Sequence, residues 1–208
     1  MGWMMKVVSE EEQNRAKWSG GITTQLAIYP PGSEYKERNF AWRISTATVD
    51  DAKSTFTALP GFKRIIMPLQ GEPLKLDHKE HHKVVLNPLE TDIFQGAWIT
   101  ESEGRVQDFN LMLANGCDGN MQGYDIVDKC IFKPQTDKLE SNGNTVTVAF
   151  YLLTGQMNIE QGKQTSKIQK GDFVTFTAEA KEKPVEYTLR SKGEVPAIVA
   201  CVVVKYDK

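Results

Sequence analysis

Short alternations of apolar and polar residues run through most of the chain and predict strands. A period of two places successive side chains on opposite faces of a sheet. These segments lie between clusters of Gly, Pro, Asn and Asp, which is typical of an all-β sandwich or barrel. The expected strands cover 23–29, 40–49, 64–69, 73–76, 83–86, 91–94, 104–113, 145–153, 156–160, 172–176, 185–189 and 197–205.

Helical periodicity is nearly absent, and one short helix is expected near the N-terminus. Ser9 followed by Glu10-Glu11-Glu12 has the form of a capping box, a pattern that opens helices. Ser19-Gly20-Gly21 then ends this helix no later than Trp18, because glycine disfavours a helix interior.

A polar segment in the second half of the chain marks the expected boundary between two lobes. Residues 134–144 are polar and contain Pro and Asn-Gly-Asn, and the loop 114–123 is rich in Gly, Asn and Asp. The sequence therefore predicts one unit of two lobes. The unit spans 1–208, with lobes of approximately 15–115 and 140–205 and the boundary within 114–144.

A weak internal repeat relates the two expected lobes. A strand ends at Gly71, a short hairpin follows, and a turn with Asp92 leads into an aromatic strand. The same order recurs at Gly155 and Asp172. Two small barrels of the cupin type in one chain would produce this repeat, and so would chance similarity between hairpins.

The strand expected at 104–113 carries polar groups where a buried strand would be apolar. Asp108 and Asn110 share one face, whereas Phe109, Leu111 and Leu113 share the other. One interpretation is an edge strand with its polar face in water. The other is a barrel strand whose polar face lines a ligand cavity.

Other expected strands carry polar residues that can meet this face. Arg43 and Ser45 share a face of 40–49, Thr23 and Gln25 share one of 23–29, and Arg64 begins 64–69. If all of these turn inward, Asp108 can pair with one arginine and the other is left for a ligand carboxylate, which guanidinium binds bidentately. The alternative is that both arginines pair with acidic residues across the sheet without any ligand.

The sequence gives less support to a metal site or to a nucleophilic active site than to a binding cavity. The three histidines, His78, His81 and His82, lie within seven residues, so the usual cupin set of three His and one Glu from two hairpins cannot be assembled. They could chelate a metal locally, but Lys79 and Lys83 favour a solvated hairpin tip, and we expect no cofactor. There is no Gly-x-Ser-x-Gly elbow.

An enzyme and an interaction module remain as alternatives to a binding protein. A metal-independent isomerase or hydrolase would use Asp108 as its base and an arginine to stabilise an oxyanion. The cavity offers no second obvious proton carrier, so a non-enzymatic role is favoured. A barrel filled by its own side chains would instead indicate a structural or interaction module.

Composition and charge restrict the kinds of partner and the location that we expect for this protein. The 208 residues carry a net charge of −2 without a long basic run, which argues against nucleic acid. The longest apolar run, 196–204, is far shorter than a membrane span and predicts a buried strand. Cys117, Cys130 and Cys201 are odd in number and form no Cys-x-x-Cys pair, which favours a cytoplasmic location.

Four segments resemble the HutD/Ves family of bacterial two-lobed cupin proteins. They are Trp18-Ser19-Gly20-Gly21-Ile22-Thr23, 40–47, 56–64 and 104–112. The resemblance implies a cytoplasmic bicupin that forms a homodimer and binds a small acidic metabolite such as formyl- or formiminoglutamate, with links to histidine utilisation or stress responses. The candidate ligand-binding residues are Arg43, Ser45, Arg64, Asp108, Asn110, Thr23, Gln25 and Trp18.

Overall fold

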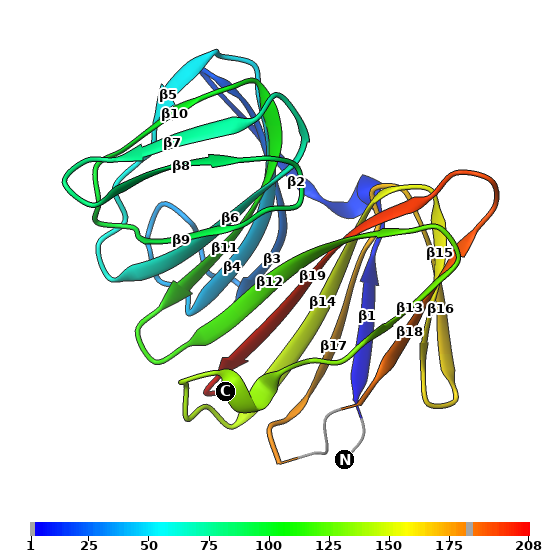
Figure 1. The fold of residues 1–208 in the computed structure, drawn as a ribbon. Helices are drawn as coiled ribbons and strands as arrows, with labels where there is room; N and C mark the ends of the chain where they lie inside the picture. Colours follow the sequence, from blue (N-terminus) through cyan, green and yellow to red (C-terminus); the bar gives the residue numbers. More distant parts are fainter. Residues whose placement is uncertain (1–2, 182–184) are drawn as a thin grey trace. The chain divides into compact units, whose positions relative to one another are not determined.

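The computed structural model describes residues 3–181 and 185–208, and these form an almost entirely β structure (Figure 1). The all-β class predicted from the alternation is therefore confirmed. The chain divides into two compact units. We call Gln13–Asn115 the central unit, and Met1–Glu12 together with Gly116–Lys208 the terminal unit. Among the described residues, no helix has the length and apolar character needed to cross a membrane.

The central unit consists of two antiparallel sheets. A six-stranded sheet has the order β2-β3-β4-β11-β6-β9, and a four-stranded sheet has the order β5-β10-β7-β8 (Figure 1). The strands are β2 Asn14–Trp18, β3 Gly21–Tyr29, β4 Trp42–Val49, β5 Lys53–Thr55, β6 Phe62–Gly71, β7 Leu74–His78, β8 His82–Leu86, β9 Asp92–Gln95, β10 Thr100–Glu103 and β11 Val106–Ala114.

Apolar side chains from both sheets of the central unit meet in one core. This core joins Ile66 and Val106 of the six-stranded sheet to Leu74, Leu76 and Leu86 of the four-stranded sheet. The two sheets therefore pack face to face, as in other β-sandwiches and barrels. The face of the six-stranded sheet that meets this core also carries the polar residues of β4 and β11.

The terminal unit repeats this two-sheet plan. Its five-stranded sheet has the order β1-β17-β14-β19-β12, and its four-stranded sheet has the order β13-β18-β15-β16. The strands are β1 Met4–Val8, β12 Asp118–Ile126, β13 Lys129–Phe132, β14 Thr145–Thr154, β15 Gln156–Gln161, β16 Gln164–Gln169, β17 Phe173–Glu179, β18 Tyr187–Lys192 and β19 Ala197–Tyr206.

Aromatic rings dominate the core of the terminal unit. Phe150, Phe176 and Tyr187 are almost fully buried and contact one another edge to face, the arrangement that aromatic quadrupoles favour. The apolar run predicted as a buried strand forms β19, which pairs with β14 and β12 inside the five-stranded sheet.

The expected N-terminal helix is reduced to one 3-10 turn, η1 Glu10–Glu12. The capping box itself is present, because the backbone N–H and the hydroxyl of Ser9 both donate to Glu12 Oε2, at 2.9 Å each. The residues that follow pair with β3 and form strand β2 instead of continuing the helix. The prediction of a helix beyond Glu12 was therefore wrong, since tertiary pairing overrode local preference.

Several strands have no clear signal in the sequence. Strands β1, β2, β5, β10, β13 and β16 were not expected, and β12 occupies part of the presumed loop 114–123. Within the described residues, the terminal unit thus contains segments that precede and follow the central unit in the sequence, whereas the sequence suggested a second lobe beginning near 140. A second 3-10 turn, η2 Thr136–Lys138, lies in the polar segment.

Candidate functional site

The polar residues of β4 and β11 lie on one face of the six-stranded sheet. The antiparallel register sets Asp108 opposite Ala47 and Asn110 opposite Ser45. Arg43 of β4 and Arg64 of β6 both lie opposite Met112, from the two sides of β11. Neighbouring strands therefore bring the two arginines, the carboxyl and the amide together, as the alternation predicted. We call these residues, with Ser45 and Gln25, the arginine cluster.

Arg43 is held by neutral groups. Its Nε donates to Gln25 Oε1 at 2.9 Å, and its Nη1 donates to Ser45 Oγ at 3.0 Å. The ring of Tyr35 lies 4.6 Å from the guanidinium carbon. The side chain is almost fully buried, and burial lowers the pKa of Arg43 below its usual range.

Arg64 is the least satisfied cation of the cluster. Its Nη2 donates to Asn110 Oδ1 at 2.8 Å, whereas its Nε is buried and has no hydrogen-bond partner within the described residues. The guanidinium carbon packs 4.8 Å from the ring centroid of Phe56 and 5.0 Å from that of Phe94. Burial lowers the pKa of Arg64 to about 10, so the group stays charged near neutral pH.

Asp108 is the carboxyl of the cluster. Its Oδ1 accepts a hydrogen bond from Asn110 Nδ2, so Asn110 lies between Asp108 and Arg64. Burial raises the pKa of Asp108 to about 7, although the charge of Arg64 and hydrogen bonds from Asn110 and the Ala47 backbone act in the opposite direction. Near neutral pH, the cluster therefore holds two cations and a carboxyl that is only partly ionised.

The remaining predicted ligand-binding residues lie in the cluster or beside it, with the exception of Trp18. Ser45 is buried, and Gln25 is half-buried and bonded to Arg43. Thr23 is half-buried opposite Ala47, on the same face of the sheet. Trp18 lies on edge strand β2 and is 41% exposed, so the structure does not bring it into the arginine cluster.

The aromatic residues around the arginine cluster could not be identified from the sequence. Tyr35 and Phe56 lie in loops, where strand alternation gives no indication of direction. Phe94 was recognised as part of a strand, but its contact with Arg64 depends on the pairing of β9 with β6. Only the tertiary arrangement shows that rings cover the faces of both guanidinium groups.

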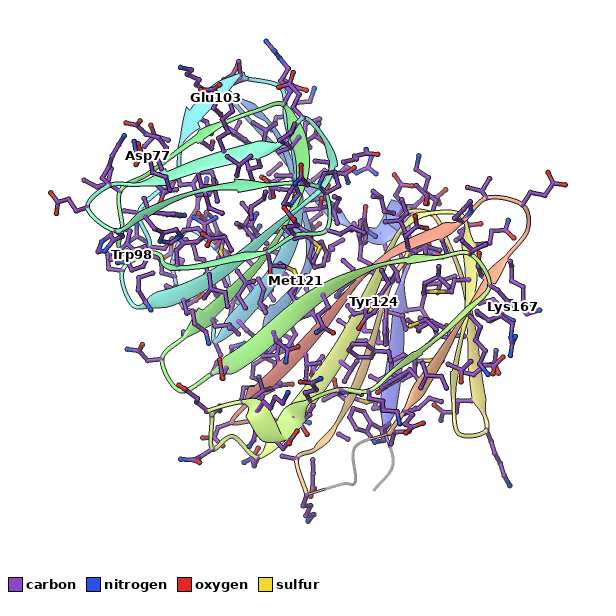
Figure 2. All side chains as sticks on the ribbon, in the orientation of Figure 1. Asp77, Trp98, Glu103, Met121, Tyr124 and Lys167 are labelled. Carbon is purple, nitrogen blue, oxygen red and sulfur yellow. The ribbon has the colours of Figure 1, made fainter. Side chains whose placement is uncertain are left out.

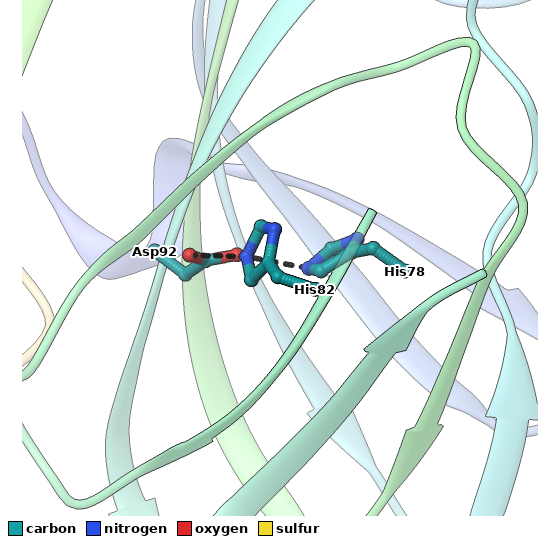
Figure 3. Close-up of side chains that lie close together, drawn as sticks. All are labelled: His78, His82 and Asp92. Atoms are coloured by element: carbon teal, nitrogen blue, oxygen red, sulfur yellow. Dashed lines mark hydrogen bonds and ion pairs between the residues drawn. The ribbon is translucent and has the colours of Figure 1, made fainter. Parts of the chain in front are cut away.

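A second group of side chains lies at the β7–β8 hairpin and β9 (Figure 3). His78 and His82 face each other across the hairpin, and Asp92 opens β9. Asp92 Oδ2 lies 2.8 Å from His78 Nε2, and Asp92 Oδ1 lies 3.0 Å from His82 Nε2. Burial lowers the pKa of His78, although the carboxylate of Asp92 opposes this shift.

The hairpin histidines differ from the sequence expectation in two respects. His78 is buried with 1% exposure, so it does not belong to a solvated tip. His81 stacks on Trp98, with ring centroids 3.8 Å apart, and it is absent from the group that could hold a metal. The third member is Asp92, which sequence spacing could not identify because it lies on another strand.

The outer face of the four-stranded sheet carries a groove of about 540 Å³. Figure 2 shows Asp77 and Glu103 on this outer side. The lysines there already have acidic partners: Lys75 lies 2.7 Å from Glu103, and Lys83 lies 2.9 Å from Asp77. Because these charges are exposed and paired, this groove is a weaker anion site than the arginine cluster.

The profile that defines the HutD family matches residues 10–197, which is most of the chain. The chain belongs to the HutD family. The resemblance seen in the four sequence segments is thereby confirmed, and the match also extends through the terminal unit.

Solved structures place this HutD-family chain among cupin-like folds. A conserved protein of unknown function from Pseudomonas aeruginosa is 20% identical, with a TM-score of 0.79 over 97% of this chain and 99% of that one. HutD from Pseudomonas fluorescens is 19% identical, with a TM-score of 0.68 over 96% and 98%. The bacterial pirin YhhW from Escherichia coli, solved with nickel(II), is 10% identical, with a TM-score of 0.61 over 98% and 100%.

Proposed function

We propose that this HutD-family protein binds a small carboxylic acid at the arginine cluster and acts without catalysing a reaction. The observation that carries the proposal is the incomplete pairing of Arg64. This guanidinium is 6% exposed, and its Nε has no hydrogen-bond partner within the described residues. A buried cation with an unused donor is costly to the fold, and a bound carboxylate offsets that cost.

The geometry of Arg64 suits a carboxylate. The planar guanidinium fork can donate two parallel hydrogen bonds to the two oxygens of one carboxylate. Nε is unused, and Nη2 carries a second hydrogen besides the one that it donates to Asn110. Together they provide a pair of donors for one carboxylate.

The charge of the cluster favours an anion as well. Arg43 and Arg64 are both cationic, whereas Asp108 has a pKa of about 7 and compensates only in part. An incoming carboxylate supplies the missing negative charge, and the nearby neutral donors of Asn110 and Ser45 can bind polar substituents. The resemblance to HutD proteins suggests an N-acyl or formimino derivative of glutamate as the ligand.

Calorimetric titration tests this binding. We expect N-formylglutamate, N-acetylglutamate or glutarate to release or absorb heat on binding, and the matching neutral diester to give no signal. Arg64→Gln should weaken binding about 10- to 100-fold, because a charge-assisted hydrogen bond contributes roughly 1.5–3 kcal/mol.

Arg105→Gln is the matched control. It removes the same charge from an exposed side chain, whose Nε donates to the backbone oxygen of Asp50 at 3.0 Å. Binding by this variant should equal that of the unaltered protein. If no carboxylate binds to the folded protein, or if both substitutions weaken binding equally, the arginine cluster is not the site.

The titration of Asp108 favours a second candidate, a metal-independent isomerase or hydrolase. A carboxyl with a pKa of about 7 can accept a proton near neutral pH, and Arg64 could stabilise a developing oxyanion. Turnover of an acyl-glutamate that is abolished in folded Asp108→Asn would favour this enzyme over the binding protein. The cytoplasmic location and the homodimer remain predictions.

A further inference from the structure

The β7–β8 hairpin and β9 bring three potential metal ligands to one point (Figure 3). The nearest ligand atoms of His78, His82 and Asp92 all lie within 4.8 Å of one another. A tetrahedral zinc ion with bonds of about 2.0–2.2 Å holds its ligand atoms roughly 3.3 Å apart. Small side-chain rotations are therefore enough to place the three ligand atoms around one ion.

The surroundings hold His78 in a fixed orientation. Its Nδ1 lies 2.8 Å from the hydroxyl of Thr100, and its ring packs 4.5 Å from that of Phe94. Histidine ligands in metal sites commonly bond their second ring nitrogen to a neighbour, which fixes the ring and leaves the other nitrogen for the metal. Here Nδ1 has that neighbour, and Nε2 points to Asp92.

Exposure varies across the group in a way that suits an open metal site. The side chain of His78 is fully buried, that of Asp92 is 13% exposed and that of His82 is 38% exposed. Solvent can therefore reach the group from the side of His82, which provides an entry path for an ion.

We propose that His78, His82 and Asp92 form a binding site for one divalent transition-metal ion of the zinc class. Two imidazole nitrogens and one carboxylate oxygen are ligands that such ions prefer. The ion would bind Nε2 of both histidines in the neutral tautomer that carries its proton on Nδ1, in place of their present contacts with Asp92, and water would complete a tetrahedral shell. None of the three ligands belongs to the arginine cluster, so the metal proposal does not depend on carboxylate binding, although Arg64 of that cluster lies near His78.

The charges around the three ligands determine the affinity that we expect for a metal ion. Asp92 contributes one negative charge, whereas Arg64, which packs on the same Phe94 ring as His78, places a cation nearby. A cationic neighbour opposes metal binding. We therefore expect weaker binding than in structural sites with four protein ligands, together with easy removal of the ion by a chelator.

Titration of the chelator-treated full chain, prepared without a histidine tag, tests the proposal. We expect one Zn²⁺ to bind per chain by calorimetry, and Co²⁺ to give the visible absorption of a tetrahedral complex. Asp92→Asn and His82→Gln should each weaken Zn²⁺ binding at least about tenfold, because each removes one ligand.

His81→Gln is the matched control, because it removes a histidine of the same hairpin that stacks on Trp98. This variant should bind Zn²⁺ as the unaltered chain does. His82 is preferred to the buried His78 for substitution because its side chain is partly exposed, and thermal unfolding checks that each variant is folded. The proposal would be overturned if the unaltered chain bound no stoichiometric Zn²⁺, if His82→Gln and Asp92→Asn bound Zn²⁺ as tightly as the unaltered chain, or if His81→Gln lost binding to the same extent as they do.

Discussion

At the scale of single residues, Asp108 is the group whose chemistry depends most on its surroundings. The carboxyl is 5% exposed and accepts a hydrogen bond from Asn110, which in turn accepts one from Arg64. Burial raises its pKa to about 7 even though Arg64 acts in the opposite direction. The protonation state of the arginine cluster therefore changes within the physiological pH range.

This titration predicts that carboxylate binding depends on pH. Below about pH 7 Asp108 is neutral, whereas above it the ionised group repels a bound carboxylate. The affinity should be highest below pH 7 and should fall by up to about tenfold per pH unit above it. Dissociation constants measured by calorimetry between pH 5.5 and 8.5 give the profile.

Asp108→Asn tests whether this pH dependence comes from Asp108. The variant should bind the carboxylate with little change across the same range, because no ionisable group remains at position 108. An identical fall in affinity in the variant would contradict the role of Asp108.

Sequence alternation could predict part of this site at the residue scale. Asp108 and Asn110, like Arg43 and Ser45, share a face because they are two positions apart on a strand. Tyr35, which covers Arg43, could not be found in this way because it lies in a loop, and neither could Asp92 of the separate group with His78 and His82, because it lies on another strand. Their contacts arise only when distant segments pack together.

At the scale of elements, glycine defines both ends of β6. Gly61 precedes the strand with φ of +84°, and Gly71 ends it with φ of +111°. A Cβ at Gly61 would meet nothing within 4 Å, whereas one at Gly71 would collide with the backbone oxygen of Arg105. That oxygen accepts the backbone N–H of Glu72 at 3.0 Å, so it cannot move without losing this bond.

The two glycines predict different costs of substitution. Gly61→Ala should lower the free energy of unfolding by about 1 kcal/mol, the usual cost of a left-handed residue with a side chain. Gly71→Ala should cost about 3 kcal/mol or more, because steric collision adds to the backbone strain. Urea unfolding of both variants measures the difference, and equal costs would contradict the role of the close approach to Arg105.

At the scale of the whole molecule, the two units are formed from the chain in different ways. The central unit is one continuous segment, Gln13–Asn115, whereas the terminal unit takes residues from both sides of it. Strand β1 joins the five-stranded sheet by pairing Met4–Val8 with β17. Without β1, the edge of β17 would be left with unpaired backbone groups.

Fragments of the chain test this arrangement. The segment Gln13–Asn115 has its own buried cores and should unfold cooperatively by itself. The segment Gly116–Lys208 lacks β1 and should be less stable and more prone to aggregate, and a peptide covering β1 should restore part of its stability. Circular dichroism during thermal unfolding measures both. A stable Gly116–Lys208 fragment that is unaffected by the peptide would contradict the role of β1.

The sequence alone predicts the all-β class, the family, most of the long strands and the shared face of the arginine cluster. These features follow from the alternation of side chains along each strand and from short sequence motifs, and both involve only a few neighbouring residues. Long-range contacts are what make β2 a strand, include β1 in the terminal unit and bring Asp92 to His78. These features depend on pairing and burial between segments far apart in the chain, and no local pattern encodes such contacts.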